Sequence, residues 1–372
     1  MQENSTISAC GTIGIDLGDK RHQVCMMTPD GAIAMEGRID NTPAALEAMF
    51  GTMEPALIAL ESGTHSAWIK YALEGWGHTV IVANPCELAA ITSSQKKTDQ
   101  RDARMLARLA RVDPQLLCPV QHRSLQAQTD LALLKARHAL VKVRSALIGH
   151  CRGIVKSFGA RLPACSSAAF ARRAQQAVPE ELREALEPLV RQVGELGEKI
   201  SLLERKIEAL AEERYPQSER LTAVGSVGAL TALCFMLVLD EAARFEKSRS
   251  VGAYVGLAPK QDQSGEVNKQ CRISKAGNPY LRVLLVQCAQ HLLSRLGRDC
   301  ELRRWGLKLC ERGGKAAKKR AVIAVARKLA VQLHALWASG KDYDPFYAEK
   351  QRARRSGGGG GEAAAPGEAR AA

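Results

Sequence analysis

The chain has 372 residues, a length that allows two domains, each with its own core. It carries 53 Lys and Arg against 39 Asp and Glu, a net charge of +14. Residues 260–330 alone hold 17 basic and 5 acidic side chains. A local excess of this kind is typical of a surface that neutralises a phosphate backbone, so nucleic acid is the expected partner.

Cysteine usage and hydropathy limit the class of protein further. The 11 cysteines occur singly, without the spacing of a zinc site, and are expected to be small core residues in a reducing cytoplasm. Residues 1–10 do not resemble a secretory signal. The longest apolar stretch, residues 229–239, is too short to span a membrane. We therefore expect a soluble, cytoplasmic protein without a membrane partner.

Four carboxylates stand where strands end or a helix begins in the first hundred residues. Asp16 closes the apolar run of residues 11–16, and Glu61 closes residues 56–61 before Ser-Gly. Asp99 and Asp102 open an alanine- and leucine-rich helical pattern, and their spacing puts them on one helical face. The sequence therefore predicts that the four side chains converge.

Converging carboxylates oppose each other's ionisation unless a cation lies between them. Mg²⁺ takes oxygen ligands, and two such ions about 3.5–4 Å apart stabilise the attacking and leaving oxygens of a phosphoryl transfer. Asp16, Glu61, Asp99 and Asp102 are thus candidate Mg²⁺ ligands. The alternative is that each is a cap or a surface charge, with Asp99 as an N-cap and Glu61 in a loop.

Two long helices are predicted next. From Ser124 to about Phe158, leucine, isoleucine and valine recur every seven residues. Between 182 and 210, apolar residues alternate steps of four and three, as in the seam of a coiled coil. Pro188 indicates either a kink or a helix start, so the seam is clearest over 189–210. It could pack against the first helix or against another chain in a dimer or tetramer.

The remaining third is predicted to be mostly helical. The glycine-punctuated segment 221–230 is similar to a helix-hairpin-helix element, whose backbone approaches DNA phosphates. Residues 260–269 are interpreted as a polar loop, where Ser264 before a glycine is either a loop residue or a nucleophile. Asn278 and Pro279 form a helix start for a helix to about Leu296.

Basic residues follow this loop into the helices. Arg303, Arg304 and the segment 315–320 lie on helical patterns, and either a solvated face or backbone contact fits them. The glycine-rich segment 352–372 cannot bury apolar surface and is predicted to be a disordered tail. The candidate nucleic-acid contacts are Lys260, Lys269, Arg272, Lys275, Arg282, Lys315, Lys318, Lys319 and Arg320.

Residues 11 to about 337 resemble the DEDD-type transposases of bacterial insertion sequences, a group understood as RNA-guided serine recombinases. The motifs that carry the resemblance are Gly14-Ile-Asp16, Glu61-Ser-Gly-Thr64, Lys97-Thr-Asp-Gln-Arg-Asp-Ala103, Val255-Gly-Leu-Ala-Pro259, Ser264-Gly265 and Ser274-Lys-Ala-Gly-Asn-Pro-Tyr-Leu-Arg282. The resemblance implies an α/β RuvC-like, ribonuclease H-like domain over 11–123 and a coiled-coil linker over 124–214. A mostly α-helical transposase domain over 215–347 and a tail over 348–372 would follow.

The resemblance also implies roles for these residues. The acidic tetrad would hold Mg²⁺, and Ser264 would attack a DNA phosphodiester to form a phosphoserine link, with Ser248, Ser250 and Ser274 as alternative nucleophiles. The implied partners are double-stranded DNA at the element's ends and target, and a structured noncoding guide RNA. The site would be composite, assembled from two protomers of a homo-oligomer. A Holliday-junction-resolvase-like nuclease would need the carboxylates without the serine, and a non-catalytic nucleic-acid-binding protein would need only the basic patch.

Overall fold

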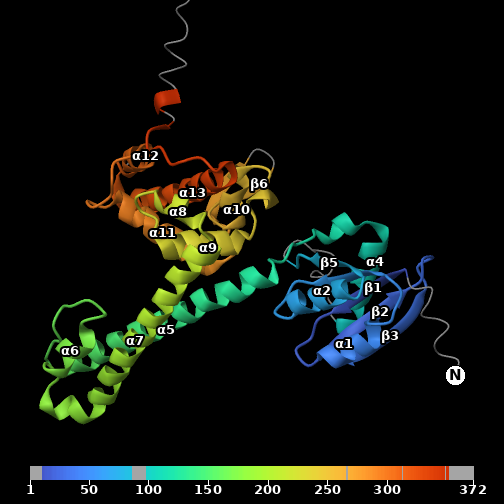
Figure 1. Ribbon diagram of the computed structural model, residues 1–372, viewed down its shortest axis with the longest axis horizontal. Helices are drawn as coiled ribbons and strands as arrows, with labels where there is room; N and C mark the ends of the chain where they lie inside the picture. Colours follow the sequence, from blue (N-terminus) through green and yellow to red (C-terminus); the bar gives the residue numbers. More distant parts are fainter. Residues whose placement is uncertain (1–10, 86–97, 265–266, 312, 348, 352–372) are drawn as a thin grey trace, which may run out of the picture. The chain divides into compact units, whose positions relative to one another are not determined.

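The computed structural model describes residues 11–85, 98–264, 267–311, 313–347 and 349–351, and for residues 261–264, 267–270 and Lys315 it describes the backbone alone. The chain divides into two compact units between His122 and Arg123, and each unit is described by itself (Figure 1). The proposed tail lies largely outside the described residues. The finer division of the second unit at residue 214 stays a prediction.

The first unit is an α/β domain. Its elements are β1 (Thr12–Asp16), β2 (Arg21–Met27), β3 (Ile33–Asp40), α1 (Pro43–Phe50), β4 (Leu57–Glu61), α2 (Ser66–Gly75), β5 (Thr79–Ala83), α4 (Asp99–Val112) and η2 (Pro114–Leu117). The strands form one sheet in the order β3-β2-β1-β4-β5. The first three are antiparallel, and β4 and β5 run parallel to β1. This mixed sheet is consistent with the expected RuvC-like domain.

The alternation of side chains along the strands separates two cores. Ile13, Ile15 and Leu60 pack with α1 and α2 on one face. The other face is lined by small residues, among them Gly14 and Ala59, and α4 lies against it. Small side chains let the helix approach the sheet closely. The candidate carboxylates Asp16 and Glu61 belong to this sheet face, which α4 covers.

The second unit is mostly helical. Its elements are α5 (Leu125–Ser157), α6 (Phe170–Gln175), η3 (Glu180–Leu182), α7 (Arg183–Arg214), α8 (Ser218–Thr222), α9 (Ala229–Leu239), η4 (Ala242–Arg244), η5 (Ser248–Ser250), α10 (Val251–Tyr254), β6 (Pro259–Ser264), β7 (Val267–Ile273), α11 (Pro279–Leu293), α12 (Glu301–Cys310) and α13 (Gly314–Ser339). The expected helix starts are confirmed, because the side chain of Ser124 caps α5 and that of Asn278 caps α11. Between α8 and α9 the segment 223–228 forms a turn, but a helix-hairpin-helix element is not shown.

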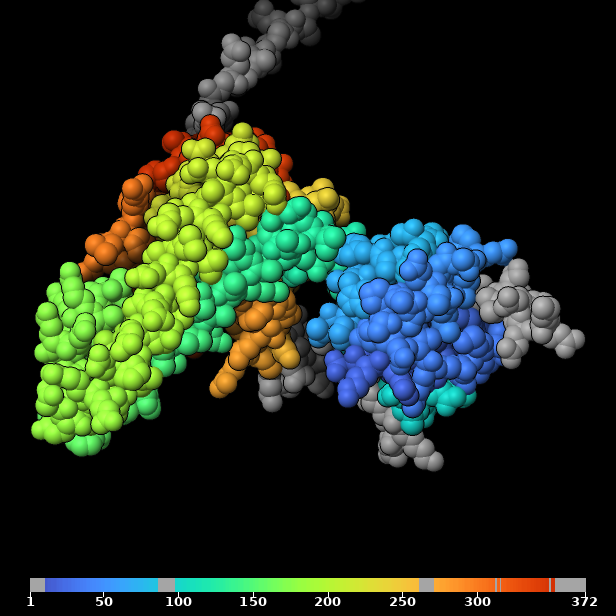
Figure 2. All heavy atoms as spheres, turned by 60° about the horizontal axis from the view of Figure 1, so that its bottom comes forward, coloured from blue at the N-terminus to red at the C-terminus, as the bar shows by residue number. Residues whose placement is uncertain are grey.

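α5 and α7 form a helical arm that carries α6 at its far end (Figure 2). The end of α5 and the start of α7 share one core with α6, whereas Leu131 of α5 and Ile207 of α7 join the main core of the unit. The two helices are therefore antiparallel. Ile200 and Leu196 of the predicted seam are buried within this chain, and α7 continues through Pro188. A seam between chains is not shown and stays a proposal.

The main core of the second unit centres on α9, α11 and α13. Every residue of α9 from Thr231 to Leu239 is buried. By length and composition, residues 316–339 of α13 form a helix that is apolar enough to cross a membrane. However, Val325, Leu329 and Leu333 of this helix pack in the core of the unit. α13 therefore serves as a core helix. Among the described cysteines Cys25, Cys151, Cys234, Cys288 and Cys300 are buried, as small core residues.

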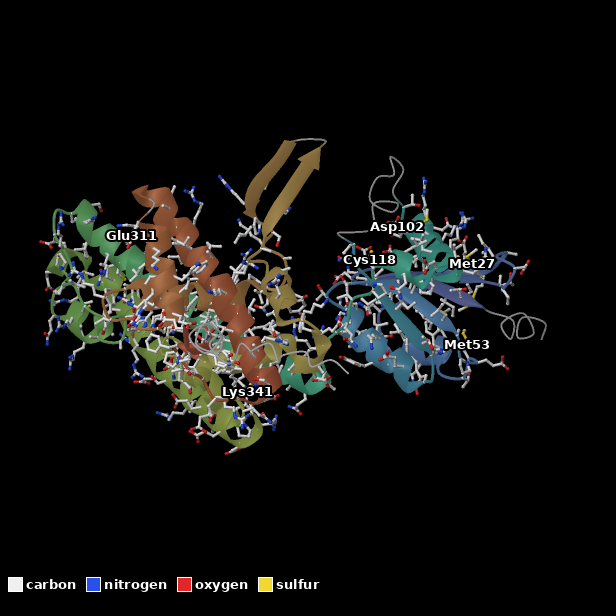
Figure 3. All side chains as sticks on the ribbon, turned by 90° about the horizontal axis from the view of Figure 1, so that it is seen from above. Met27, Met53, Asp102, Cys118, Glu311 and Lys341 are labelled. Atoms are coloured by element: carbon white, nitrogen blue, oxygen red, sulfur yellow. The ribbon has the colours of Figure 1, made fainter. Side chains whose placement is uncertain are left out.

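The prediction of a loop over residues 260–269 is wrong. β6 and β7 form an antiparallel hairpin that stands out from the helices of its unit (Figure 3). Residues 260–269 lack the apolar alternation that marks a half-buried strand, so the sequence pattern gave no sign of these strands. Ser264 is the last residue of β6 and pairs with Val267, the first residue of β7.

Candidate active site

Two of the four carboxylates end neighbouring parallel strands. Ile15 of β1 pairs with Leu60 of β4, so Asp16 and Glu61 follow at the same edge of the sheet. Both alternate with residues of the α4 face, Asp16 with Gly14 and Glu61 with Ala59. Asp16 and Glu61 therefore share one edge and one face, and both are half-buried. Their positions at strand ends are as predicted, whereas their joint role in a metal site stays a prediction.

The packing of α4 brings the third carboxylate to this edge. A Cβ built on Gly14 would overlap the carbonyl oxygen of Ala103 and the amide of Ala107, so α4 contacts β1 backbone to backbone. At the other end of the helix, Arg111 donates to the carbonyl oxygen of Pro29, which lies beside Gly11 at the start of β1. α4 thus runs opposite to β1, and its first turn lies at the end of β1 where Asp16 stands.

Asp102 is buried with 4% of its surface exposed, whereas Asp99 is exposed in the first turn of α4 (Figure 3 labels Asp102). The alternative in which Asp99 is the N-cap is wrong, because Thr98 is the N-cap and its hydroxyl accepts from the amide of Arg101. The positive end of the helix dipole stabilises carboxylates in this turn. Within the described residues, no three His, Cys, Asp or Glu side chains are close enough to hold a metal ion.

Two polar residues of α4 fix how the helix lies on the sheet. Gln100 and Arg104, one turn apart, both donate to the carboxylate of Glu36 on β3. The hydrogen bond from Arg104 holds the pKa of Glu36 below its ordinary value, so this carboxylate is ionised at neutral pH. Burial, with Glu36 nearby, raises the pKa of Cys25 to about 11, so its thiol stays protonated. The hydrogen bonds of Gln100 and Arg104 to Glu36 fix the rotation of α4 about its axis, so that its face with Asp102 is buried.

The hairpin that carries Ser264 rises from a tightly packed base. The amide of Ser274 donates to the carbonyl oxygen of Ala258, and that of Lys275 to Gly256. Gly256 and Gly277 have φ of 72° and 66°, and a Cβ on either would overlap the backbone of the facing segment. The two motifs 255–259 and 274–282 therefore form one rigid base, although they are separate in the sequence.

Arg282 belongs to this base. Its Nη1 donates to the carbonyl oxygens of Val255, at 3.0 Å, and Ala276, at 2.6 Å. Partial burial lowers the pKa of this arginine. Arg282 was expected to contact nucleic acid, but in the structure it joins the two backbone segments. Sequence reasoning missed this role because its partners are backbone carbonyls, which leave no mark on the side-chain pattern.

The alternative nucleophiles have other surroundings. The Nε2 of His334, which is buried, lies 2.9 Å from the carbonyl oxygen of Ala242 and donates to it. Its Nδ1 lies 2.9 Å from the hydroxyl of Ser248, so this hydroxyl is already engaged in a hydrogen bond with the ring. The hydroxyl of Ser274 accepts from the amide of Ala276 at 3.4 Å, and Ser250 is exposed. None of the three lies on β6 or β7.

The expected nucleic-acid contacts fall into two groups. Lys269 and Lys315 have side chains outside the described part of the chain. Six of the others are exposed, and within the described part of the chain none of them forms an ion pair. They are Lys260, Arg272, Lys275, Lys318, Lys319 and Arg320. Backbone contact through Arg303 and Arg304 is not supported, because Arg303 donates to the carbonyl oxygens of Leu292 and Ser294, and Arg304 pairs with Asp299.

Comparison with known proteins assigns a family to this architecture. A DEDD transposase model, described as a transposase, matches residues 13–159, and a model described as the transposase IS116/IS110/IS902 family matches residues 218–302. The chain belongs to the IS110-type transposases. It is 27% identical to the transposase for insertion sequence element IS1111A of Coxiella burnetii, over 89% of this chain and 90% of that protein.

Two further relatives widen the range of activities in this family. The transposase for insertion sequence element IS1328 of Yersinia enterocolitica is 29% identical over 76% of this chain and 84% of that protein. The pilin gene-inverting protein of Moraxella lacunata is 24% identical over 89% of this chain and 97% of that protein. As an IS110-type transposase, this chain is a DNA-processing enzyme. The first matched region holds the four carboxylates and the second holds the β6–β7 hairpin.

Proposed function

We propose that this IS110-type transposase cuts and rejoins DNA strands with Ser264 as nucleophile and a Mg²⁺ site formed by Asp16, Glu61, Asp99 and Asp102. The observation that carries the proposal is the shared edge and face of Asp16 and Glu61, to which α4 brings the buried Asp102. An all-oxygen donor set fits a hard divalent cation. When bound, Mg²⁺ would offset negative charge on the reacting phosphate and its leaving oxygen.

In the proposed step, the Ser264 hydroxyl oxygen bonds to a phosphorus of the DNA backbone as the bond from phosphorus to a sugar oxygen breaks. The serine proton goes to solvent or a base, and the sugar leaves as a free hydroxyl. The hydroxyl of another strand then attacks the same phosphorus, and the bond from phosphorus to the serine oxygen breaks. The two strands are thereby joined, and the serine hydroxyl is restored by taking up a proton. Energy of the phosphodiester is kept in the phosphoserine, so no cofactor such as ATP is required.

The partners in this proposal are double-stranded DNA and a structured noncoding guide RNA, in a homo-oligomer acting on DNA in the bacterial cytoplasm. Sequence choice would then reside in RNA base pairing, and the protein would read backbone and shape. Exposed basic side chains support such contact with a phosphate backbone. They are Lys260, Arg272 and Lys275 at the hairpin, and Lys318 and Lys319 on α13. Relatives named for transposition and for gene inversion both act on DNA in ways that need strand exchange.

A covalent adduct tests the mechanism. The full chain is mixed with Mg²⁺, supercoiled DNA with the element's ends, target DNA and RNA transcribed from its flanks, and denatured products are examined for protein-linked DNA. We expect an adduct with the native chain that depends on the RNA and on Mg²⁺. Ser264→Ala and Asp16→Asn should abolish it, whereas Ser250→Ala, which removes an exposed hydroxyl away from the hairpin, should not.

Two other results would replace the proposal. Equal DNA cleavage by the native chain and Ser264→Ala, without adduct, would indicate a metal-dependent nuclease of the resolvase type. Binding without any cleavage, unaffected by Asp16→Asn, would indicate a nucleic-acid-binding protein.

A further inference from the structure

The two long helices of the arm differ in charge. Residues 131–179, which comprise most of α5, the connection after it and α6, contain nine Lys and Arg and no Asp or Glu. By contrast, α7, which packs along α5, contains eight Glu. A stretch of chain with this one-sided positive charge attracts a polyanion.

Only some of these basic side chains are engaged within the protein. Arg137 pairs with Glu204 of α7, and the guanidinium of Arg152 lies 5.6 Å from the ring centroid of Phe170. Five others are exposed, and no ion pair involves them in the part of the chain that the structure describes. They are Lys135, Lys142, Lys156, Arg161 and Arg172.

Phe158, at the end of α5, is an aromatic residue that the core of the arm leaves outside. The amide of Gly159 donates to the carbonyl oxygen of Lys156 at 3.1 Å, and that of Ala160 to Val155 at 3.2 Å. With Gly159 at a φ of 77°, these bonds form a regular helix end that fixes the backbone of Phe158. Val155 and Ala160 pack in the core shared with α6, yet Phe158 is 65% exposed. Its ring is therefore available to a partner.

The exposed ring lies between two of the exposed cations. Phe158 is two residues from Lys156 and three from Arg161, so the three Cα atoms lie within about 11 Å of one another. An aromatic ring stacks on an unpaired base, while neighbouring cations neutralise the phosphates on either side of that base. Duplex DNA keeps its bases stacked, whereas RNA presents unstacked bases in loops and bulges. This combination of side chains therefore fits an RNA loop.

We propose that Phe158 stacks on an unpaired base of an RNA loop and that Lys156 and Arg161 contact the phosphates beside it. The site lies at the far end of the arm, where α5 leads into α6 (Figure 1). The inference rests on the proposed function, in which a structured RNA is a partner. It deepens that function by assigning the RNA a contact away from the hairpin and the carboxylates.

Three substitutions of Phe158 test the stacking. Binding of the full chain is followed by fluorescence anisotropy without divalent cations, with a labelled RNA stem-loop and with the same stem as a blunt RNA duplex. Phe158→Ala should weaken binding of the stem-loop about 5- to 150-fold, the contribution of one stacked base, and leave binding of the duplex unchanged. Phe158→Trp should retain native affinity, whereas Phe158→Leu, which is apolar without a ring, should not.

A matched control guards against a general effect of losing apolar surface. Leu202→Ala removes a side chain that is 46% exposed on α7 of the same arm, and it should bind the stem-loop as the native chain does. Because Phe158 and Leu202 are both largely outside the core, both alanine variants should unfold at the native temperature.

The salt dependence of binding separates the ring from the cations. Lys156→Gln should make the slope of log affinity against log salt shallower by about 0.7, because one contact with a phosphate of a single strand is lost. Phe158→Ala should lower affinity without changing the slope, because stacking releases no counterions. Lys199→Gln, at an exposed lysine of α7, should leave both affinity and slope as in the native chain.

Native affinity of Phe158→Ala for the stem-loop would overturn the inference. Full recovery by Phe158→Leu would also overturn it and would indicate an apolar contact, such as one with a second copy of the chain. Because the assay requires neither Mg²⁺ nor cleavage, its result is separate from that of the adduct experiment. An adduct that requires RNA, together with native binding by Phe158→Ala, would refute this site alone. Loss of binding in Phe158→Ala, together with an adduct that forms without RNA, would support the site and refute the guide RNA.

Discussion

Gly14 determines how closely α4 can lie on the sheet. Gly14→Ala would force a Cβ into the backbone of Ala103 and Ala107, which cannot yield as a side chain can. We expect a loss of about 1–3 kcal/mol or more in unfolding free energy of the first unit, from overpacking. Denaturant unfolding measures it. Gly75→Ala, where a Cβ meets nothing within 4 Å, should be neutral or slightly stabilising. Equal stability of the two variants would contradict this packing.

Asp130 joins the start of α5 to the end of α7. Its carboxylate, 7% exposed, accepts from the Tyr215 hydroxyl at 2.7 Å and from Arg214 and Gln126. Burial alone would raise the pKa of Asp130, but the hydrogen bonds and the Arg214 charge outweigh it and hold the pKa below its ordinary value. Asp130→Asn should lower the unfolding free energy by about 2 kcal/mol at pH 7.

The pH dependence of this loss follows from the sign of the shift. A carboxyl with a depressed folded-state pKa stabilises the protein above its unfolded pKa, about 3.9, and loses this effect as pH falls towards the folded pKa. The difference in melting temperature between native chain and Asp130→Asn should therefore be constant from pH 7 to about 5 and shrink below about 4. A difference that grew on acidification would contradict the assignment.

At the scale of elements, two basic residues at the base of the β6–β7 hairpin have different expected roles, since Arg282 holds the base together and Lys275 is expected to contact DNA. Arg282→Met removes the donor that joins the carbonyls of Val255 and Ala276, and we expect a loss of about 1–3 kcal/mol with adduct formation strongly reduced. Lys275→Gln, at an exposed position of the same base, should leave stability unchanged and weaken DNA binding in a salt-dependent way. The two variants are compared by thermal unfolding and anisotropy. Loss of DNA binding without destabilisation in Arg282→Met would restore its role as a contact.

The elements differ in how well they could be predicted from the sequence alone. The strand ends at Asp16 and Glu61 and the caps at Ser124 and Asn278 were predictable, because turn residues and hydrophobic period are local signals. The hairpin was not, since its backbone pairing does not require an apolar alternation. The approach of Asp102 to the sheet was only partly predictable. It depends on the contact between Gly14 and α4, which joins residues far apart in the chain.

The whole molecule adds a question that neither unit answers alone. The carboxylates lie in the unit before Arg123 and Ser264 lies in the unit after it, so the proposed site must be assembled between units of one chain or of two. The apolar seam of α7 does not decide this, because Ile200 and Ile207 are already buried within the chain. Leu189, Leu203 and Leu210 of the same seam are only half-buried, and pairing of the seam with another chain stays a proposal.

Mixing two inactive variants distinguishes these arrangements. Asp16→Asn keeps an intact Ser264, and Ser264→Ala keeps intact carboxylates. If the carboxylates of one chain act together with Ser264 of another chain, a mixed oligomer contains a site in which both Asp16 and Ser264 are native. The covalent adduct should then reappear on mixing. Each variant alone supplies the control and should form none. If the site lies within one chain, every site in the mixture carries a defect and no adduct forms at any ratio. Because the composite arrangement makes assembly a condition for cleavage, we expect the mixture to be active and its activity to fall on dilution.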